Sequence, residues 1–117
     1  MNTVNWFELP VVDMPRAVAF YQQLLAVELK LADGPRPMAI FAYTQPGVSG
    51  ALVKDQRKPS MDGAIVYLKA DGKLDACLER VGTAGGEVVV GKTDIGPNGH
   101  FALVRDTEGN LVGLHAA

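Results

Sequence analysis

The feature that most constrains the fold is an internal repeat with an offset of 60 residues. Phe41 matches Phe101, and the run 50–53 matches the run 110–113, in one register without a gap. The apolar spacing of residues 14–25 also recurs 60 residues later. Two copies are too few for a solenoid. The repeat therefore predicts one pseudo-symmetric unit of two halves, with its functional site between them.

Length and composition predict one globular domain. The chain has 117 residues, of which 48% are hydrophobic and 21% are charged, as in ordinary globular proteins. The net charge is −2 and no run of Lys and Arg occurs, so we expect no nucleic-acid partner. The lone cysteine, Cys77, forms no internal disulfide and is predicted to be a buried thiol. Neither a signal peptide nor an apolar stretch of membrane-spanning length occurs, so we expect no membrane contact and a cytoplasmic location.

The first half predicts a strand, a helix and three short strands. Residues 3–12 alternate, which places Trp6 and Glu8 on one face of a strand and Phe7 and Leu9 on the other. Asp13 is a suitable N-cap for a helix over residues 14–25, whose apolar stripe buries one side. The following strands are expected at about 27–31, 38–43 and 50–53, separated by Gly-Pro and Pro-Gly pairs.

The second half repeats this order after a polar linker at 54–63. A strand at 64–70 and a helix at 74–84, ended by Gly85-Gly86, are followed by strands near 87–90, 101–105 and 111–115. Residues 106–109 form the turn between the last two strands. The predicted fold class is α+β, with two β-α-β-β-β modules at about 1–55 and 63–117 in a pseudo-twofold arrangement.

Two segments carry a resemblance to a known family. The run 11–21 (Val-Val-Asp-Met-Pro-Arg-Ala-Val-Ala-Phe-Tyr) and the closing run 99–115 resemble the vicinal-oxygen-chelate superfamily, which includes glyoxalase I, extradiol dioxygenases and the bleomycin and fosfomycin resistance proteins. The resemblance covers essentially the whole chain. It implies the glyoxalase/bleomycin-resistance/dioxygenase fold, a cup that holds a small molecule, often with a divalent metal, and a homodimer.

The resemblance also implies where a metal would be held, namely by side chains of the first and last strand of each module. The matching residues are Trp6 and Val66 on the first strands, and Val53 and Gly113 on the last. A divalent ion needs nitrogen, oxygen or thiolate ligands, and none of these side chains supplies one that is typical. We therefore predict no metal and no other cofactor.

The remaining cup residues predict an apolar ligand site with one acid. The predicted ligand-binding residues are Trp6, Glu8, Val53, Val66, Leu68, Leu111 and His115. Among apolar neighbours, Glu8 would have a raised pKa unless a cation or donor compensates, and His115 is the expected protonatable neighbour. Structural roles for these residues stay open: Glu8 bonded to backbone or water, His115 exposed, and Trp6 in the core.

Two functions follow from these residues. The first is a metal-independent binding module for a small, partly aromatic molecule, because ligand pockets are mostly apolar. The alternative is an enzyme of the lyase, isomerase or dioxygenase type, with Glu8 as base or with an unusual metal site drawn from Glu8, His100 and His115. A structural dimer without a ligand is a third possibility. The Gly/Pro-rich loop 92–99 is either a lid, with Lys92 or Asp94 at the ligand, or an ordinary connection.

Overall fold

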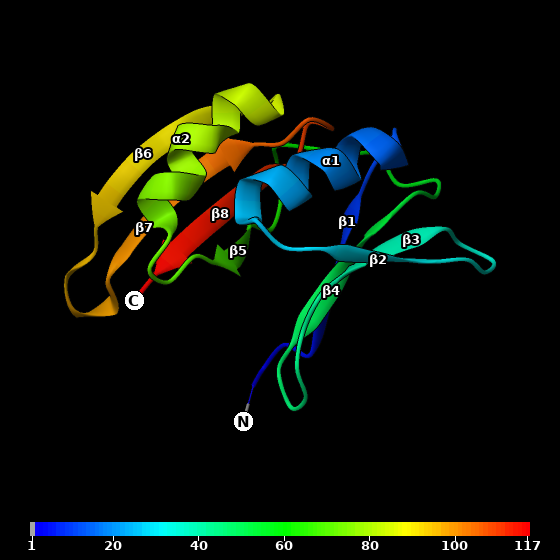
Figure 1. Cartoon of the computed structure of the whole chain (residues 1–117), viewed down its shortest axis with the longest axis horizontal. Coiled ribbons are helices and arrows are strands. Elements are labelled where there is room, and N and C mark those ends of the chain that lie inside the picture. Colours follow the sequence, from blue (N-terminus) through cyan, green and yellow to red (C-terminus); the bar gives the residue numbers. More distant parts are fainter. Residues whose placement is uncertain (1) are drawn as a thin grey trace.

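The computed structural model describes residues 2–117 and contains two β-α-β-β-β modules (Figure 1). The elements of the first module are β1 (Trp6–Pro10), α1 (Met14–Leu25), β2 (Leu29–Ala32), β3 (Met38–Phe41) and β4 (Ser49–Val53). Those of the second are β5 (Val66–Lys69), α2 (Leu74–Ala84), β6 (Glu87–Asp94), the 3-10 turn η1 (Gly96–Asn98), β7 (His100–Arg105) and β8 (Leu111–Ala116). The strand orders are β1-β4-β3-β2 and β5-β8-β7-β6, with parallel β1/β4 and β5/β8 pairs. The predicted fold class is confirmed.

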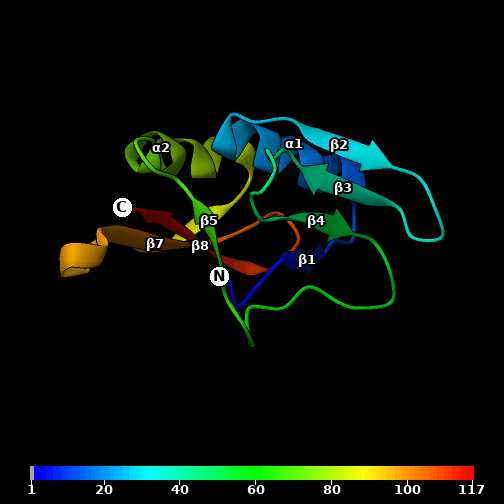
Figure 2. The same cartoon turned by 90° about the horizontal axis from the view of Figure 1, so that it is seen from below.

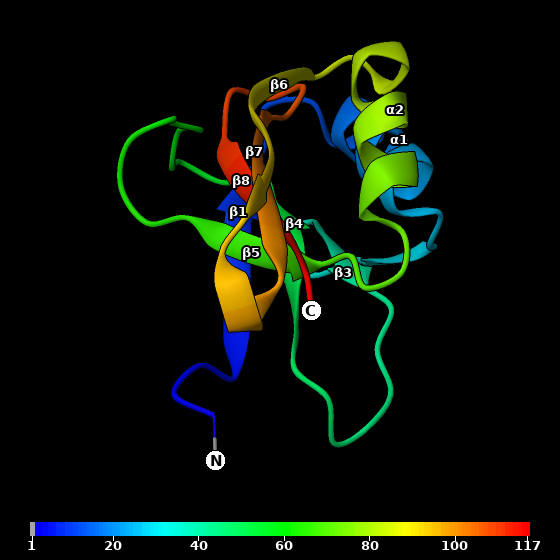
Figure 3. The ribbon, with the colours of Figure 1, turned by 90° about the vertical axis from the view of Figure 1, so that its left-hand side faces the viewer.

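The helices and the sheets form two layers. Both helices lie on the same side of the two sheets, as Figure 3 shows, and they pack against each other. In Figure 2 the helices form the upper layer above β1, β4, β5, β7 and β8. We call the opposite side of the sheets, which no helix covers, the open face. No helix in the described residues is long and apolar enough to cross a membrane.

Local sequence explains where the helices begin and end. The side chain of Asp13 accepts a hydrogen bond from Arg16 N at 3.0 Å, which makes it the N-cap of α1 as predicted. Helix α2 ends at Gly85, whose φ of 104° is in the left-handed region that favours glycine. Cys77 is fully buried on the inner side of α2. The apolar side of each helix therefore covers its own sheet.

The ungapped offset of 60 is wrong in the strands. Leu9 pairs with Leu52 and Leu68 pairs with Leu114, and all four are buried in the core beneath the helices. These two pairs are equivalent, so the offset is 59 in the first strand and 62 in the last. The additional residues belong to the β6–β7 hairpin, in which β6 continues to Asp94 and η1 follows. The predicted strand at 87–90 was therefore too short.

A buried polar cluster in the 106–110 turn joins the modules. The fully buried Asp106 carboxylate accepts hydrogen bonds from the Tyr21 hydroxyl at 2.5 Å and from the Asn110 side-chain amide at 3.0 Å. It also accepts from the backbone N–H groups of Glu108 and Asn110. The Asn110 amide in turn donates to Pro10 O at 2.8 Å. The turn therefore fastens the second module to helix α1 and strand β1 of the first.

Glu108 extends this joint to the start of α1. Its carboxylate accepts from the backbone N–H of Val12 at 2.8 Å and of Asp13 at 2.7 Å, and it pairs with Arg16 Nε at 2.8 Å. Burial of the carboxylate raises its pKa, but the hydrogen bonds from Arg16, Asp13 and Val12 outweigh this effect and lower the pKa of Glu108 to about 2. The ionised form is therefore stabilised at neutral pH.

Candidate ligand pocket between the modules

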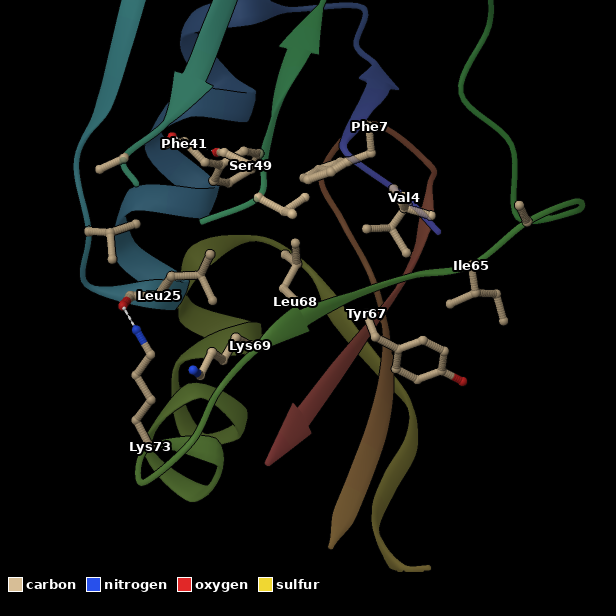
Figure 4. A pocket seen from close by; sticks show the side chains of 15 residues that line it. Val4, Phe7, Leu25, Phe41, Ser49, Ile65, Tyr67, Leu68, Lys69 and Lys73 are labelled. Atoms are coloured by element: carbon tan, nitrogen blue, oxygen red, sulfur yellow. Dashed lines mark hydrogen bonds between the residues drawn. The ribbon is translucent and has the colours of Figure 1, made fainter. Parts of the chain in front are cut away.

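An apolar pocket lies between strand β5 and the first module. Its volume is about 670 Å³, within the range of small-molecule sites. Figure 4 shows Phe7, Phe41 and Ser49 on one side of it and strand β5 on the other. The lining is mostly apolar: Val4, Phe7, Leu25, Val27, Phe41, Ala42, Val48, Ser49, Ala64, Ile65, Val66, Tyr67, Leu68, Lys69 and Lys73. The pocket therefore lies between the two modules.

The two modules meet at two equivalent places, one beside the β7–β8 turn and one beside the β3–β4 turn. The 106–110 turn fills the first place, and the pocket lies at the second. In the repeat register Val48 takes the place of Asn110, and Lys69 takes the place of Pro10. Asn110 bonds Pro10 O at 2.8 Å, whereas a valine side chain has no donor to bond Lys69 O. We call the place beside the β7–β8 turn the closed end of the joint, and the place beside the β3–β4 turn, where the pocket lies, the open end.

The polar groups at this pocket are mainly cationic. The ammonium of Lys73 donates to Leu25 O at 2.8 Å (Figure 4), which holds it beside the C-terminal end of α1. Lys69 has a side chain that is 85% exposed and pairs loosely with Asp71 at 3.5 Å. The lining contains no Asp or Glu. An acidic ligand group therefore meets no carboxylate of the lining.

Glu8 lies on the open face and is paired with two arginines. Its carboxylate accepts from Arg36 Nη2 at 2.9 Å and from Arg57 Nη2 at 3.0 Å, and both arginines also contact Asp55. The hydrogen bond from Arg36 is the main cause that lowers the pKa of Glu8, although burial acts in the opposite direction. The compensation that the sequence analysis assigned to a ligand donor or a histidine is therefore supplied by Arg36 and Arg57.

The other predicted ligand residues do not form one site with Glu8. Some lie near Glu8 on β1 and β4, and the others lie in the second module. Trp6, 37% exposed, shares the open face with Glu8, and Val53 is fully buried beside Pro10. Leu111 pairs with Arg105 in β7. The Nε2 atom of His115 lies 2.6 Å from Asn98 O. No hydrogen bond joins Glu8 and His115 among residues 2–117.

Val66 and Leu68 do not share a face with Glu8, contrary to the sequence analysis. Leu68 belongs to the core beneath the helices, and Val66 packs against that core. Both line the pocket instead. Tyr67 takes the place of Glu8 in the repeat register, because it pairs with Gly113 as Glu8 pairs with Ala51. The offset of 59 in the first strand accounts for this slip by one residue.

The positions implied for a metal do not fit a divalent ion. Trp6, Val66, Val53 and Gly113 carry no suitable ligand atoms, and the register matches Val53 with His115 rather than with Gly113. The Tyr67 ring lies so close to Gly113 that a Cβ atom there would overlap it. Within residues 2–117, no group of three His, Cys, Asp or Glu side chains is arranged to hold a metal.

The 92–99 loop lies apart from the pocket. Residues 92–94 continue strand β6, and Lys92 pairs with Asp75 of α2 at 3.1 Å. Asp94 accepts a hydrogen bond from Gly96 N within the loop and pairs with His100 across the hairpin. None of these residues lines the pocket between the modules. The arrangement is that of a hairpin connection.

Comparison with known proteins agrees with this architecture. The model of the Glyoxalase/Bleomycin resistance protein/Dioxygenase superfamily matches residues 3–114. The chain is 29% identical to the "Putative glyoxylase CFP32" of Mycobacterium bovis and Mycobacterium tuberculosis, over 99% of the chain and 46% of that protein. It therefore spans about half the length of these curated relatives.

Solved structures show the same fold. A glyoxalase/bleomycin resistance protein from Albidiferax ferrireducens superposes with a TM-score of 0.77 at 20% identity, over 99% of this chain and all of that one. The fosfomycin resistance protein FosX from Listeria monocytogenes gives 0.72 at 17% identity, over 100% of this chain and 92% of that one. A FosX mutant was solved with Mn(II) and a dihydroxypropylphosphonic acid, so a protein of this fold binds a small molecule. Family match, module order and sheet topology agree, and the chain belongs to the glyoxalase/bleomycin resistance protein/dioxygenase superfamily.

Proposed function

We propose that this protein binds a small, largely apolar molecule in the pocket between its modules, without a divalent metal. The observation that carries the proposal is the pocket of about 670 Å³ with aromatic and aliphatic lining. Phe7 and Phe41, whose ring centroids are 5.6 Å apart, offer an aromatic wall. Burial of apolar ligand surface against such a wall provides the binding free energy.

The enzyme alternative receives no support from Glu8. A general base works best when its pKa is near the operating pH. The pKa of Glu8 is instead lowered, and its oxygens are bonded by Arg36 and Arg57. Glu8 also lies outside the pocket lining. We propose that Glu8 anchors the linker and the β2–β3 loop to strand β1.

The neutral fluorescent probe N-phenyl-1-naphthylamine tests the proposal. We expect saturable binding with one site per chain, unchanged by EDTA. Val48→Trp, which places an indole at the pocket rim, should weaken binding about tenfold, equivalent to about 1.4 kcal/mol. Val89→Trp is the matched control, because Val89 is 45% exposed on β6 and lies outside the lining.

Two results of this titration contradict the proposal. One is equal affinity of the wild type and Val48→Trp. The other is probe binding that disappears with EDTA and returns with Zn²⁺, Mn²⁺ or Fe²⁺. Circular dichroism of both variants separates a filled pocket from a lost fold.

We propose a homodimer in which the open faces of two copies meet. Trp6 and Tyr67 on the open face are 37% and 49% exposed. Large apolar side chains that stay exposed on one face are candidates for an association surface. Sedimentation should give a dimer at micromolar concentration, and Trp6→Lys should shift it towards monomer. A wild-type monomer under these conditions would rule out this assembly.

The cytoplasmic location stays a prediction.

A further inference from the structure

We propose that the ligand of the inter-module pocket is an amphipathic anion: an apolar body that carries one carboxylate, sulfonate or phosphate group, bound by Lys73 and Lys69. The inference rests on the proposed function and specifies the chemical class of its ligand. The charges of the pocket lining and the difference between the two ends of the module joint support it.

The two ends of the joint differ in one charged group. At the closed end, the Glu108 carboxylate enters from the β7–β8 turn and is bonded by Arg16, Val12 N and Asp13 N. At the open end, the corresponding β3–β4 turn, residues 42–48, contains no acidic residue. The chain therefore supplies an anion at one end of the joint and none at the other.

The open end presents cations where the closed end holds its carboxylate. Lys73 precedes α2 as Asp13 precedes α1, and it lines the pocket. Its ammonium uses one donor on Leu25 O, which leaves two of its three N–H groups for a ligand. Lys69, which also lines the pocket, adds a second positive charge and contacts Asp71 at 3.5 Å. The ammonium groups of Lys69 and Lys73 can therefore bind an anionic group of a ligand, and no carboxylate of the pocket lining competes with it.

The apolar part of the ligand has a separate place. In Figure 4, Phe7 and Phe41 lie on the side of the first module and Leu68 lies opposite them on β5, while Lys69 and Lys73 lie towards the C-terminal end of β5. Apolar and charged lining are thus separated along the pocket. This separation matches an amphipathic molecule better than a uniformly apolar or uniformly polar one.

Two probes that share one aromatic skeleton test the inference. 8-Anilinonaphthalene-1-sulfonate carries a sulfonate, and N-phenyl-1-naphthylamine is its uncharged counterpart. We expect the sulfonate to bind about fivefold more tightly at low salt, since partly exposed ion pairs contribute modestly, and the preference to fall as salt is added. Lys69→Gln/Lys73→Gln should abolish the preference and leave the neutral probe within about twofold of wild type.

Control variants separate charge from packing. Lys73→Arg keeps the charge and should retain the preference. Lys58→Gln removes an exposed linker lysine outside the lining and should change neither affinity. Thermal unfolding of each variant shows whether loss of the Lys73–Leu25 contact disturbs the fold.

The outcomes distinguish the two proposals. If the neutral probe binds in the pocket and the sulfonate binds no more tightly, the inference about the anion is wrong and the proposed function stands. A preference for the sulfonate that survives the double lysine variant also overturns the inference. If Val48→Trp leaves both probes unaffected, or neither probe binds, the proposed function itself fails.

Discussion

Asp106→Ala should destabilise the protein by about 3–5 kcal/mol, because several buried donors lose their acceptor together. The carboxylate is fully buried and accepts from the Tyr21 hydroxyl, the Asn110 side chain and two backbone N–H groups. Alanine offers none of these acceptors, and the position is fully buried. Urea unfolding at pH 7 measures the change in the free energy of unfolding.

Two variants calibrate this loss. Tyr21→Phe removes only the hydroxyl and leaves the Asp106 oxygen bonded to Asn110, so we expect a cost of about 1–3 kcal/mol. Asp33→Ala removes an exposed carboxylate and should change stability by less than about 0.5 kcal/mol. If Asp106→Ala costs no more than Asp33→Ala, the polar cluster does not join the modules.

Acidification should remove about 3 kcal/mol of stability through Glu108, between about pH 5 and pH 2. The pKa of Glu108 is about 2 in the folded protein against 4.5 as its ordinary value. A pKa that is lower in the folded state means that the unfolded chain binds the proton first. The stabilisation is therefore complete above pH 4.5 and is lost as the pH falls towards the folded pKa.

Glu108→Gln isolates this contribution. The amide keeps the shape and one acceptor but not the charge that Arg16 and the Val12 and Asp13 N–H groups stabilise. We expect this variant to be less stable by about 2–3 kcal/mol at pH 7 and to lose correspondingly less stability between pH 5 and pH 2. Parallel pH profiles of wild type and variant would show that Glu108 does not carry the acid sensitivity.

Much of the fold was predictable because each element has a local signature. The alternation of residues 3–12 placed Leu9 in the core and Glu8 on the opposite face, and the Asp13 N-cap and Gly85 set helix ends. The second module was misread by one residue in β5. Periodicity gives the two faces of a strand but does not fix which residue starts it when the matching runs differ in length.

The candidate site was less predictable because loops and pairing across the modules decide it. Arg36 and Arg57 reach Glu8 from positions 28 and 49 residues away, with no local pattern to indicate the contact. Phe7 and Phe41 were not among the predicted ligand-binding residues, yet they form the pocket wall. Val48, which lines the pocket, stands where the other turn has Asn110, a difference that becomes visible only in the structural register.

The central claim is that a ligand binds between the modules without a divalent metal, and a crystal structure with bound N-phenyl-1-naphthylamine, grown in EDTA, tests it most directly. The account predicts density for the probe against Phe7, Phe41 and Leu68, beside strand β5. Density confined to the open face near Trp6 and Glu8, with the pocket between the modules free of probe, would contradict it.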